Sequence, residues 1–170
     1  MAHSETSGYE TAHDFTFSSI DGSELRLNSF AGKVILMVNT ASRCGFTRQY
    51  AELQTLWVNY RDRGLVVIGV PSNDFGGQEP GKEPDIKEFC EVNFNIDFPL
   101  TEKMIVKGRS AHPFYKWVVS ELGMVSKPRW NFHKFLIGPK GKALDWFAPT
   151  TAPNSKRIIR AVEAALPPPT

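Results

Sequence analysis

The sequence predicts one α/β domain in which a mixed central sheet carries helices on both faces. Residues 34–38 and 65–70 are almost uninterrupted apolar runs, which is typical of strands buried on both sides. Between these runs, apolar residues recur three and four positions apart, as on the buried face of a helix. A strand, a helix and a strand joined by short connections make the two strands parallel and the crossover right-handed.

The chain before this unit predicts a loose segment followed by a β-hairpin. We expect residues 1–12 to form a flexible arm, because they are small and polar. Residues 15–17 and 25–27 then alternate apolar and polar side chains on either side of Asp21-Gly22, a dipeptide that favours hairpin turns. The folded domain is therefore expected to span residues 13–166, with 167–170 as a proline-rich tail.

The chain after the first strand predicts the rest of the sheet and its helices. Residues 71–81 are rich in turn formers and predict a loop at the sheet edge where open α/β sheets build their sites. The other expected elements are a helix over 48–62 ended by Arg63-Gly64, a helix from Pro84, a short strand over 95–100, a helix opened by His112-Pro113, a hairpin around 138–141, and a helix capped by Asn154 or Ser155. This order of elements is a thioredoxin-like layout.

The composition excludes several classes of function. The 170 residues carry a formal net charge of +2, which gives no reason to expect a nucleic acid or a membrane surface as a partner. No apolar run approaches the roughly 18 residues of a membrane span, and residues 1–6 lack the apolar core of a secretory signal, so we expect a cytoplasmic protein. The 2 cysteines are too few for a disulfide scaffold and the 4 histidines lack metal-ligand spacing, so neither a metal nor a cofactor is expected.

One cysteine stands where the sequence concentrates its chemistry. The polar turn 39–43 follows the first buried strand and brings Cys44 to the start of the predicted helix. Unpaired backbone N–H groups and the positive end of the helix dipole favour the thiolate, and Arg43 acts in the same direction. We therefore interpret Cys44 as an activated nucleophile and not as a buried core thiol.

Three motifs carry a resemblance to a known family. They are Asn-Thr-Ala-Ser-Arg-Cys-Gly-Phe-Thr at 39–47, Asn-Asp-Phe-Gly-Gly-Gln-Glu-Pro-Gly at 73–81, and Trp-Asn-Phe-His-Lys-Phe-Leu at 130–136. In this order the chain resembles the glutathione peroxidase family, in its non-selenium, thioredoxin-dependent branch with two cysteines. The resemblance implies a thioredoxin-like fold and the reduction of hydroperoxides to alcohols. It also implies that Cys44 is the peroxidatic residue and that Trp130 and Asn131 donate hydrogen bonds to its sulfur.

The second motif departs from the family pattern at Asp74, where the family usually has glutamine. A glutamine amide donates a hydrogen bond to the sulfur or to the peroxide, whereas an ionised carboxylate cannot. Asp74 could be protonated, face away from Cys44, or accept a proton from the incoming peroxide. Gln78 belongs to the following Gln-Glu-Pro, and we expect it, like Glu79, to brace the loop.

The resemblance assigns Cys90 the resolving role. In the implied cycle, hydrogen peroxide or an organic or lipid hydroperoxide oxidises Cys44 to a sulfenic acid, and Cys90 condenses with it to a disulfide. A thioredoxin-like dithiol, or glutathione, then reduces the disulfide. Cys90 also lies on the apolar stripe with Ile86 and Phe89, so a core thiol is the alternative. The short loop between Leu122 and Trp130 resembles monomeric members that accept bulky lipid hydroperoxides.

Three other functions remain open at this stage. A thiol–disulfide oxidoreductase would need a Cys-x-x-Cys, but Thr47 occupies the second place. A peroxide sensor that passes its oxidation to a partner protein would use the same two cysteines. A weakly active thioredoxin-fold binding module draws its support from Asp74 alone. His112 and His133 lack partners at ligand spacing, and we interpret both as structural or surface residues.

Overall fold

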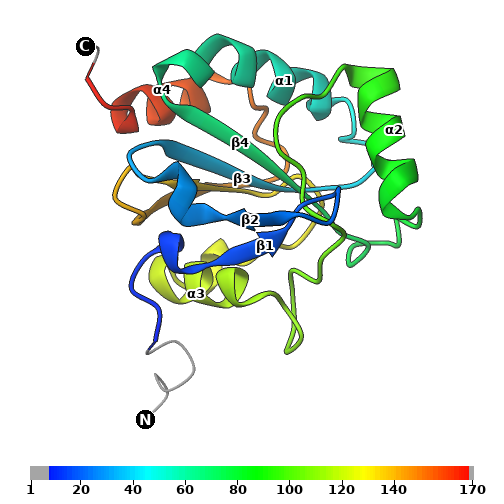
Figure 1. Ribbon diagram of the computed structural model, residues 1–170, viewed down its shortest axis with the longest axis horizontal. Helices are drawn as coiled ribbons and strands as arrows, with labels where there is room; N and C mark the ends of the chain where they lie inside the picture. Colours follow the sequence, from blue (N-terminus) through cyan, green and yellow to red (C-terminus); the bar gives the residue numbers. More distant parts are fainter. Residues whose placement is uncertain (1–7, 169–170) are drawn as a thin grey trace.

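A computed structural model describes residues 8–168 and shows a four-stranded mixed sheet (Figure 1). The strand order is β4 (Leu65–Pro71), β3 (Val34–Thr40), β5 (Lys134–Ile137) and β6 (Ala143–Phe147). β3 pairs with β4 in parallel and with β5 antiparallel, and β5 pairs antiparallel with β6. The mixed sheet, the parallel first pair and the later hairpin are therefore confirmed.

The central strand β3 contributes to a hydrophobic core on each face of the sheet. Val34, Leu36 and Val38 pack into one core, and Ile35 and Met37 pack into the other. This alternation follows from the two-residue period of a strand, and it explains why the whole run is apolar.

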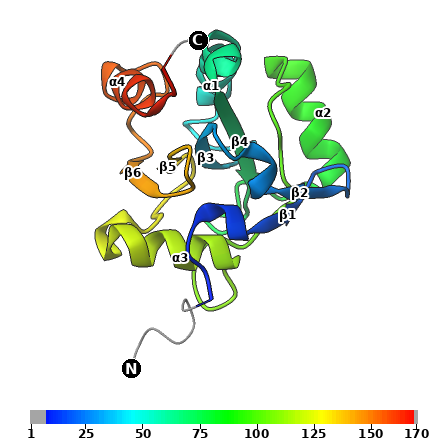
Figure 2. The same cartoon turned by 60° about the vertical axis from the view of Figure 1, so that its left-hand side comes forward.

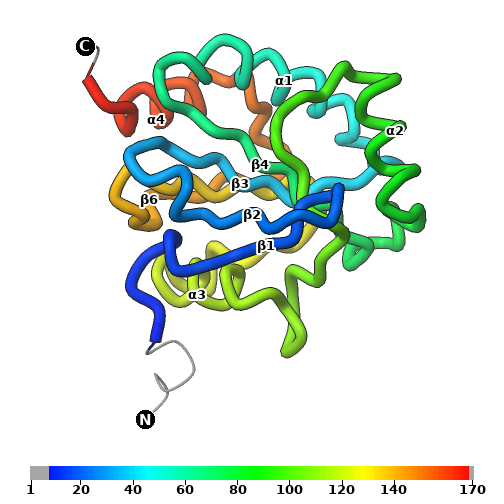
Figure 3. The backbone as a smooth tube through the Cα atoms, viewed as in Figure 1, coloured from blue at the N-terminus to red at the C-terminus, as the bar shows by residue number. Residues whose placement is uncertain are grey.

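Helices cover both faces of the sheet, as the sequence predicts. α1 (Gln49–Tyr60), α2 (Glu83–Phe94) and α4 (Lys156–Ala165) contribute to the first core, and α3 (Pro113–Leu122) contributes to the second. Figure 2 shows α3 on the opposite side of the sheet from α1 and α4. The tube in Figure 3 shows α2 at one end of the molecule, next to the beginning of α1. Short 3₁₀ turns complete the described part at Ala12–Asp14, Leu27–Phe30, Arg61–Arg63 and Met124–Ser126.

The N-terminal hairpin packs beside α3. β1 (Thr16–Ser18) and β2 (Glu24–Arg26) pair antiparallel, with Phe17 opposite Leu25, as expected. The Phe17 ring stacks on His112, with centroids 3.9 Å apart. Within the stretch expected to be an arm, Tyr9 stacks on Phe15 at 4.4 Å and Ala12 is fully buried. Residues 1–7 of that arm, and residues 169 and 170 of the expected tail, lie outside the described residues.

Two predicted elements differ from the structure. The helix predicted over 48–62 is shorter, because α1 ends at Tyr60 and a 3₁₀ turn leads to Gly64, whose φ of 108° favours glycine. The strand predicted over 95–100 is wrong: Leu100 forms only an isolated bridge to Gly69. Leu100 and Phe98 lie so close over Gly69 that a Cβ there would meet Leu100 Cδ2 at 2.6 Å. The segment therefore packs its side chains over the edge strand β4 and does not form a further strand of the sheet.

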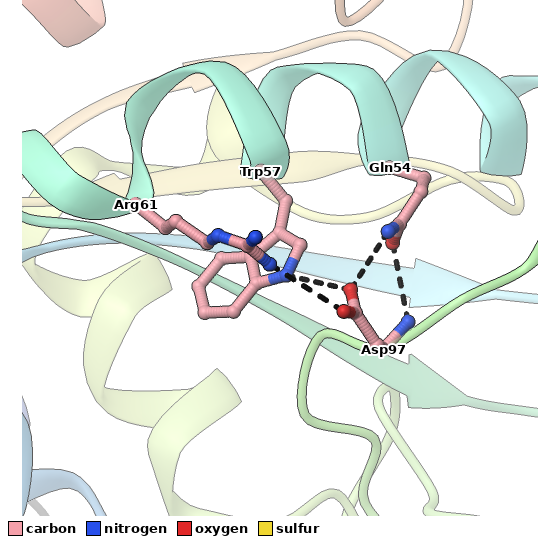
Figure 4. A network of polar contacts seen from close by, with 4 residues as sticks. All are labelled: Gln54, Trp57, Arg61 and Asp97. Carbon is pink, nitrogen blue, oxygen red and sulfur yellow. Dashed lines mark hydrogen bonds and ion pairs between the residues drawn. The ribbon is translucent and has the colours of Figure 1, made fainter.

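The segment that follows α2 is fastened to α1 by one carboxylate (Figure 4). Asp97 Oδ1 accepts hydrogen bonds from Gln54 Nε2 at 2.7 Å and from Trp57 Nε1 at 2.8 Å. Asp97 N donates to Gln54 Oε1 at 3.2 Å, and Arg61 Nη1 lies 3.4 Å from Asp97 Oδ2. The hydrogen bond from Gln54, with those from Trp57 and Arg61, lowers the pKa of Asp97 and keeps it ionised. The chain is thus fixed just beyond the C-terminal end of α2.

Among residues 8–168, no helix is both long enough and apolar enough to cross a membrane.

Candidate active site

Cys44 lies in a tight turn between β3 and α1, and it is nearly buried. The prediction that it starts the helix is wrong in detail, because α1 begins at Gln49. The N–H group that reaches its sulfur belongs instead to the turn itself: Phe46 N donates to Cys44 Sγ at 3.4 Å. Such a donor stabilises a thiolate in the way that the helix terminus was expected to do.

Thr47 fixes this turn through its hydroxyl. Cys44 N donates to Thr47 Oγ1 at 2.9 Å, and Thr47 Oγ1 donates to Ala41 O at 2.9 Å. Thr47 N also donates to Cys44 O at 3.0 Å. The sequence places Thr47 in a motif but does not reveal this role, because a single hydroxyl after a turn has many possible hydrogen-bond partners.

The Trp130–Asn131 turn is held against the end of β3. Asn39, a buried polar residue at the end of the apolar strand, donates from Nδ2 to Trp130 O at 3.1 Å. Phe132 N donates to Asn39 O at 2.6 Å, and Phe132 has a positive φ of 66°. A left-handed conformation is costly for a phenylalanine, so the surrounding contacts must hold this turn in place. The sequence feature that could have indicated this support is an asparagine directly after the apolar run 34–38.

Asn131 is fully buried and connects the turn to the loop 72–81. Its Nδ2 donates to Phe75 O at 3.3 Å and to Gln78 Oε1 at 3.1 Å. The expected hydrogen bonds from Trp130 and Asn131 to the Cys44 sulfur are not present among residues 8–168, where the donor to Sγ is Phe46 N. Gln78 O accepts a hydrogen bond from Arg43 N at 3.0 Å, next to Cys44 in the chain. All three motifs therefore meet through hydrogen bonds of Asn131 and Gln78.

Asp74 is engaged on the other side of the same loop. Its Oδ2 accepts hydrogen bonds from Val106 N at 2.7 Å and from Lys107 N at 3.3 Å. Its own N–H donates to Ser72 Oγ at 3.2 Å. Of the three possibilities considered for Asp74, this geometry fits a side chain that faces away from Cys44, because its carboxylate binds the N–H groups of the 106–107 segment.

Glu79 is a buried carboxyl group within the loop. Burial raises the pKa of this carboxyl group, although the nearby Ser42 and the charge of Lys103 act in the opposite direction. Glu79 N donates to Asn73 Oδ1 at 2.9 Å, and Lys103 Nζ donates to Glu79 O at 3.0 Å. These contacts close the loop on itself and tie it to the segment after α2.

Cys90 lies within α2 and is completely buried, on the same side of the sheet as Cys44. Both thiols are free. Burial raises the pKa of the Cys90 thiol to about 12, although the nearby Tyr50 hydroxyl lowers it in part. Cys90 is therefore protonated and unreactive while α2 is formed.

One hollow borders the loop 72–81, and a second lies along the segment that Asp74 binds. The smaller, of about 160 Å³, lies between Ser42 and Arg43 of the cysteine turn and Ile86 and Phe89 of α2. The larger, which we call the 106–128 groove, has a volume of about 310 Å³. Its lining combines apolar side chains with three lysines: Val106, Lys107, Ala111, Tyr115, Lys116, Val119, Met124, Lys127 and Pro128, with Gly108.

His112 and His133 lie outside this arrangement. His112 Nδ1 accepts from Phe114 N at 3.1 Å at the start of α3, so its Nε2 carries the proton donated to Thr16 O at 2.9 Å. His133 stacks on Trp146, and burial lowers its pKa to about 4. Among residues 8–168 no cluster of three or more His, Cys, Asp and Glu side chains could hold a metal ion.

The chain matches one protein family and several known proteins. Residues 12–119 match the family described as glutathione peroxidase. The chain is 45% identical over 143 residues to the glutathione peroxidase homolog BsaA of Halalkalibacterium halodurans, covering 83% of this chain and 91% of that protein. It is 43% identical over 152 residues to the hydroperoxy fatty acid reductase gpx1 of Synechocystis sp., covering 85% and 90%.

Solved structures agree with the fold. The crystal structure of T. cruzi GPX1 matches with a TM-score of 0.73 at 28% identity, covering 92% of this chain and 96% of that chain. The crystal structure of Trgpx in apo form matches with a TM-score of 0.72 at 35% identity, covering 91% and 97%. The predicted thioredoxin-like fold is confirmed by these neighbours.

Proposed function

This chain belongs to the glutathione peroxidase family of hydroperoxide-reducing oxidoreductases, and we propose that it acts as a two-cysteine peroxidase through Cys44 and Cys90. The observation that carries the proposal is that hydrogen bonds join all three motifs next to Cys44 in the chain. Buried Asn131 reaches the loop 72–81, and that loop reaches the backbone beside Cys44 through Gln78. A core thiol needs no such hydrogen-bonded surroundings, whereas a reactive thiolate does.

The first step is attack of the Cys44 thiolate on the terminal peroxide oxygen. A sulfur–oxygen bond forms, the oxygen–oxygen bond breaks, and the alkoxide or hydroxide that leaves takes up a proton. The products are a Cys44 sulfenic acid and an alcohol or water, with the sulfur oxidised and the peroxide reduced. The Phe46 N–H beside the sulfur supports the thiolate before the attack.

The second step requires movement of α2. Cys90 must expel water from the sulfenic acid and form a disulfide, for which the two Cα atoms must come within about 7 Å. The closed helix keeps Cys90 buried, so α2 has to unwind locally. Its packing supports this: of its 12 residues only Ile86 and Cys90 are buried, while Val92 is 74% exposed.

The reductant that fits such a disulfide is a thioredoxin-like dithiol. An opened α2 would leave the disulfide on an exposed segment that an attacking dithiol can reach. The sequence contains no set of residues that we can assign to glutathione, so we place glutathione second.

The 106–128 groove supports a preference for hydroperoxides with an acyl chain. Its apolar lining fits a hydrocarbon, and Lys107, Lys116 and Lys127 offer positive charge to a carboxylate head group. Lys107 Nζ lies 4.8 Å from the centre of the Phe75 ring, which packs at 6.2 Å from Trp130. The groove thus adjoins the Trp130 side of the site, and a relative carries the name hydroperoxy fatty acid reductase.

The test is NADPH-coupled turnover of hydrogen peroxide and of a fatty-acid hydroperoxide. Thioredoxin with its reductase is compared with glutathione with its reductase, and Cys44→Ser and Cys90→Ser serve as variants. We expect turnover with thioredoxin that both substitutions reduce strongly, Cys44→Ser more than Cys90→Ser. Turnover with glutathione that survives Cys90→Ser would instead make Cys90 a core thiol. Slow turnover with a stable mixed disulfide to one protein would favour a peroxide sensor.

A further inference from the structure

We propose that the Gln78 carboxamide is the amide donor of the Cys44 site, in the role that Asp74 does not fill. The proposal rests on the peroxidase function proposed above and names a further residue for that reaction. It is carried by the hydrogen bonds of three side chains: Asn131, Gln78 and Asp74.

The loop 72–81 presents Asp74 and Gln78 in different directions. The Asp74 carboxylate binds the N–H groups of Val106 and Lys107. Gly76 and Gly77 follow with positive φ of 70° and 61°, a pair of left-handed residues that reverses the chain. The reversal brings Gln78 beside Arg43 and Asn131.

The reversal is held by packing as well as by backbone conformation. A Cβ on Gly76 would meet Trp130 Cη2 at 2.9 Å, so the loop lies directly against the indole. Glu79 N donates to Asn73 Oδ1 at 2.9 Å and closes the loop from the other side. The Gln78 side chain is therefore delivered from a backbone that has little freedom.

The orientation of the Gln78 amide follows from its neighbours. A backbone carbonyl only accepts, so the Asn131 atom beside Phe75 O must be the Nδ2 amino group. The same amino group faces Gln78, which must therefore present its oxygen. The two N–H donors of Gln78 Nε2 then point away from Asn131, and no hydrogen bond engages them among residues 8–168.

The site also holds an acceptor that lacks a partner. Asn131 is fully buried, and its Oδ1 has no hydrogen bond within the described residues. That acceptor is itself fully buried, so the group that a hydroperoxide can reach is the half-buried Gln78 amide. Its Nε2 offers two N–H donors to the HO–O group that Cys44 attacks. During that attack, the Gln78 N–H groups would stabilise the negative charge that moves from the sulfur to the leaving oxygen.

The experiment replaces Gln78 in the full-length chain by residues of similar length without the amide donors. Gln78→Met removes them without adding charge, and Gln78→Glu keeps the oxygen that Asn131 binds. Two readouts are taken: the second-order rate of Cys44 oxidation by hydrogen peroxide, and the pH midpoint for alkylation of Cys44 by iodoacetamide. Thermal unfolding of each variant is measured alongside to detect a misfolded protein.

We expect both variants to oxidise about 10²-fold more slowly, the effect typical of losing one preorganised donor. The alkylation midpoint should move to higher pH. Asp74→Asn should change the oxidation rate by no more than about twofold, as for a substitution away from the reacting atoms.

Oxidation of folded Gln78→Met within twofold of the unsubstituted protein, or a larger loss from Asp74→Asn, would overturn the proposal. Alkylation needs no peroxide, so an unmoved midpoint would overturn it even if the protein failed to reduce peroxides. Absence of any Cys44-dependent turnover would count against the proposed function instead.

Discussion

The regions around the two cysteines are built in opposite ways. Cys44 lies in a short turn whose backbone is fixed by Thr47 and whose neighbours are joined by hydrogen bonds from three separate segments. Cys90 lies in a regular helix that buries only two of its side chains. By contrast, α1 and α3 each bury four.

The contrast indicates which step of the proposed cycle needs a fixed geometry. Attack on a peroxide depends on donors placed before the substrate arrives, so the Cys44 turn gains from rigidity. Disulfide formation depends on bringing a buried thiol across to that turn, so α2 gains from weak packing. Substitutions in the two regions should therefore affect different steps.

The largest effect is expected from Cys44→Ser. A serine hydroxyl is a far weaker nucleophile than a thiolate, so the rate of peroxide reduction should fall by about 10³-fold or more. NADPH-coupled turnover with thioredoxin measures this loss. A residual rate above a tenth of the original would contradict the assignment of Cys44.

Cys90→Ser should separate the two regions. We expect turnover with thioredoxin to fall by roughly tenfold or more, which corresponds to ~1.4 kcal/mol in the barrier. The first oxidation of Cys44 should be unchanged, because the substituted side chain lies in α2. Single-turnover kinetics with hydrogen peroxide, followed by trapping of the sulfenic acid with dimedone, distinguish the two steps. Equal losses in both would show that Cys90 supports the Cys44 turn.

The rate of disulfide formation should keep rising with pH above 9. The pKa of Cys90 is about 12 in the closed helix, against an ordinary value of 9.0, so an opened α2 loses its proton first. Between pH 9 and 12 the opened state therefore binds fewer protons, and opening is favoured by about tenfold per pH unit. Stopped-flow measurements of oxidised protein between pH 7 and 10.5 test this. A plateau near pH 9 would indicate a thiol that is already exposed.

Ile86→Ala should loosen α2 and speed resolution. Ile86 is one of the two buried side chains of the helix, and its truncation should cost ~2–4 kcal/mol of stability. We expect faster disulfide formation with an unchanged first oxidation. Hydrogen exchange of the α2 amides reports the loosening, and Val92→Ala, at a position 74% exposed, is the matched control. Slower resolution in Ile86→Ala would contradict the unwinding step.

Thr47→Val should affect the Cys44 turn, and it should slow the first oxidation where Ile86→Ala speeds the later step. The valine leaves Cys44 N and Ala41 O without their side-chain partner, which should cost ~1–3 kcal/mol. We expect a slower first oxidation and unchanged hydrogen exchange in α2. Chemical denaturation and the single-turnover rate measure the two parts. A variant that resolves faster, as Ile86→Ala should, would show that the two regions are not independent.

The sequence predicted the framework well, because the framework depends on local patterns. The apolar runs gave β3 and β4, and Pro113 and Ser155 correctly marked the beginnings of α3 and α4. The site depended on contacts that no local pattern encodes. Asn131 and Gln78 are 53 residues apart, and Asp74 and Val106 are 32 apart.

The start of α1 also depends on contacts that the local sequence pattern does not encode. The sequence around Cys44 fits a helix beginning at once, yet the Thr47 hydroxyl bonds to Ala41 O and Cys44 N and holds a separate turn. The competing hydrogen bonds of a single side chain decided the boundary. A threonine signals that possibility without fixing it.

The attachment of Asp97 to α1 sets how far Cys90 can travel. Cys90 precedes Asp97 by seven residues, so a fully unwound segment would span about 23–25 Å from the fixed point. A thiol attached through so short a segment has an effective concentration in the millimolar range at any site within that distance. An outside monothiol would need a similar concentration to capture the sulfenic acid first. In the proposed cycle, the carboxylate that holds the chain in place would thereby favour a disulfide within one molecule over mixed disulfides with free thiols.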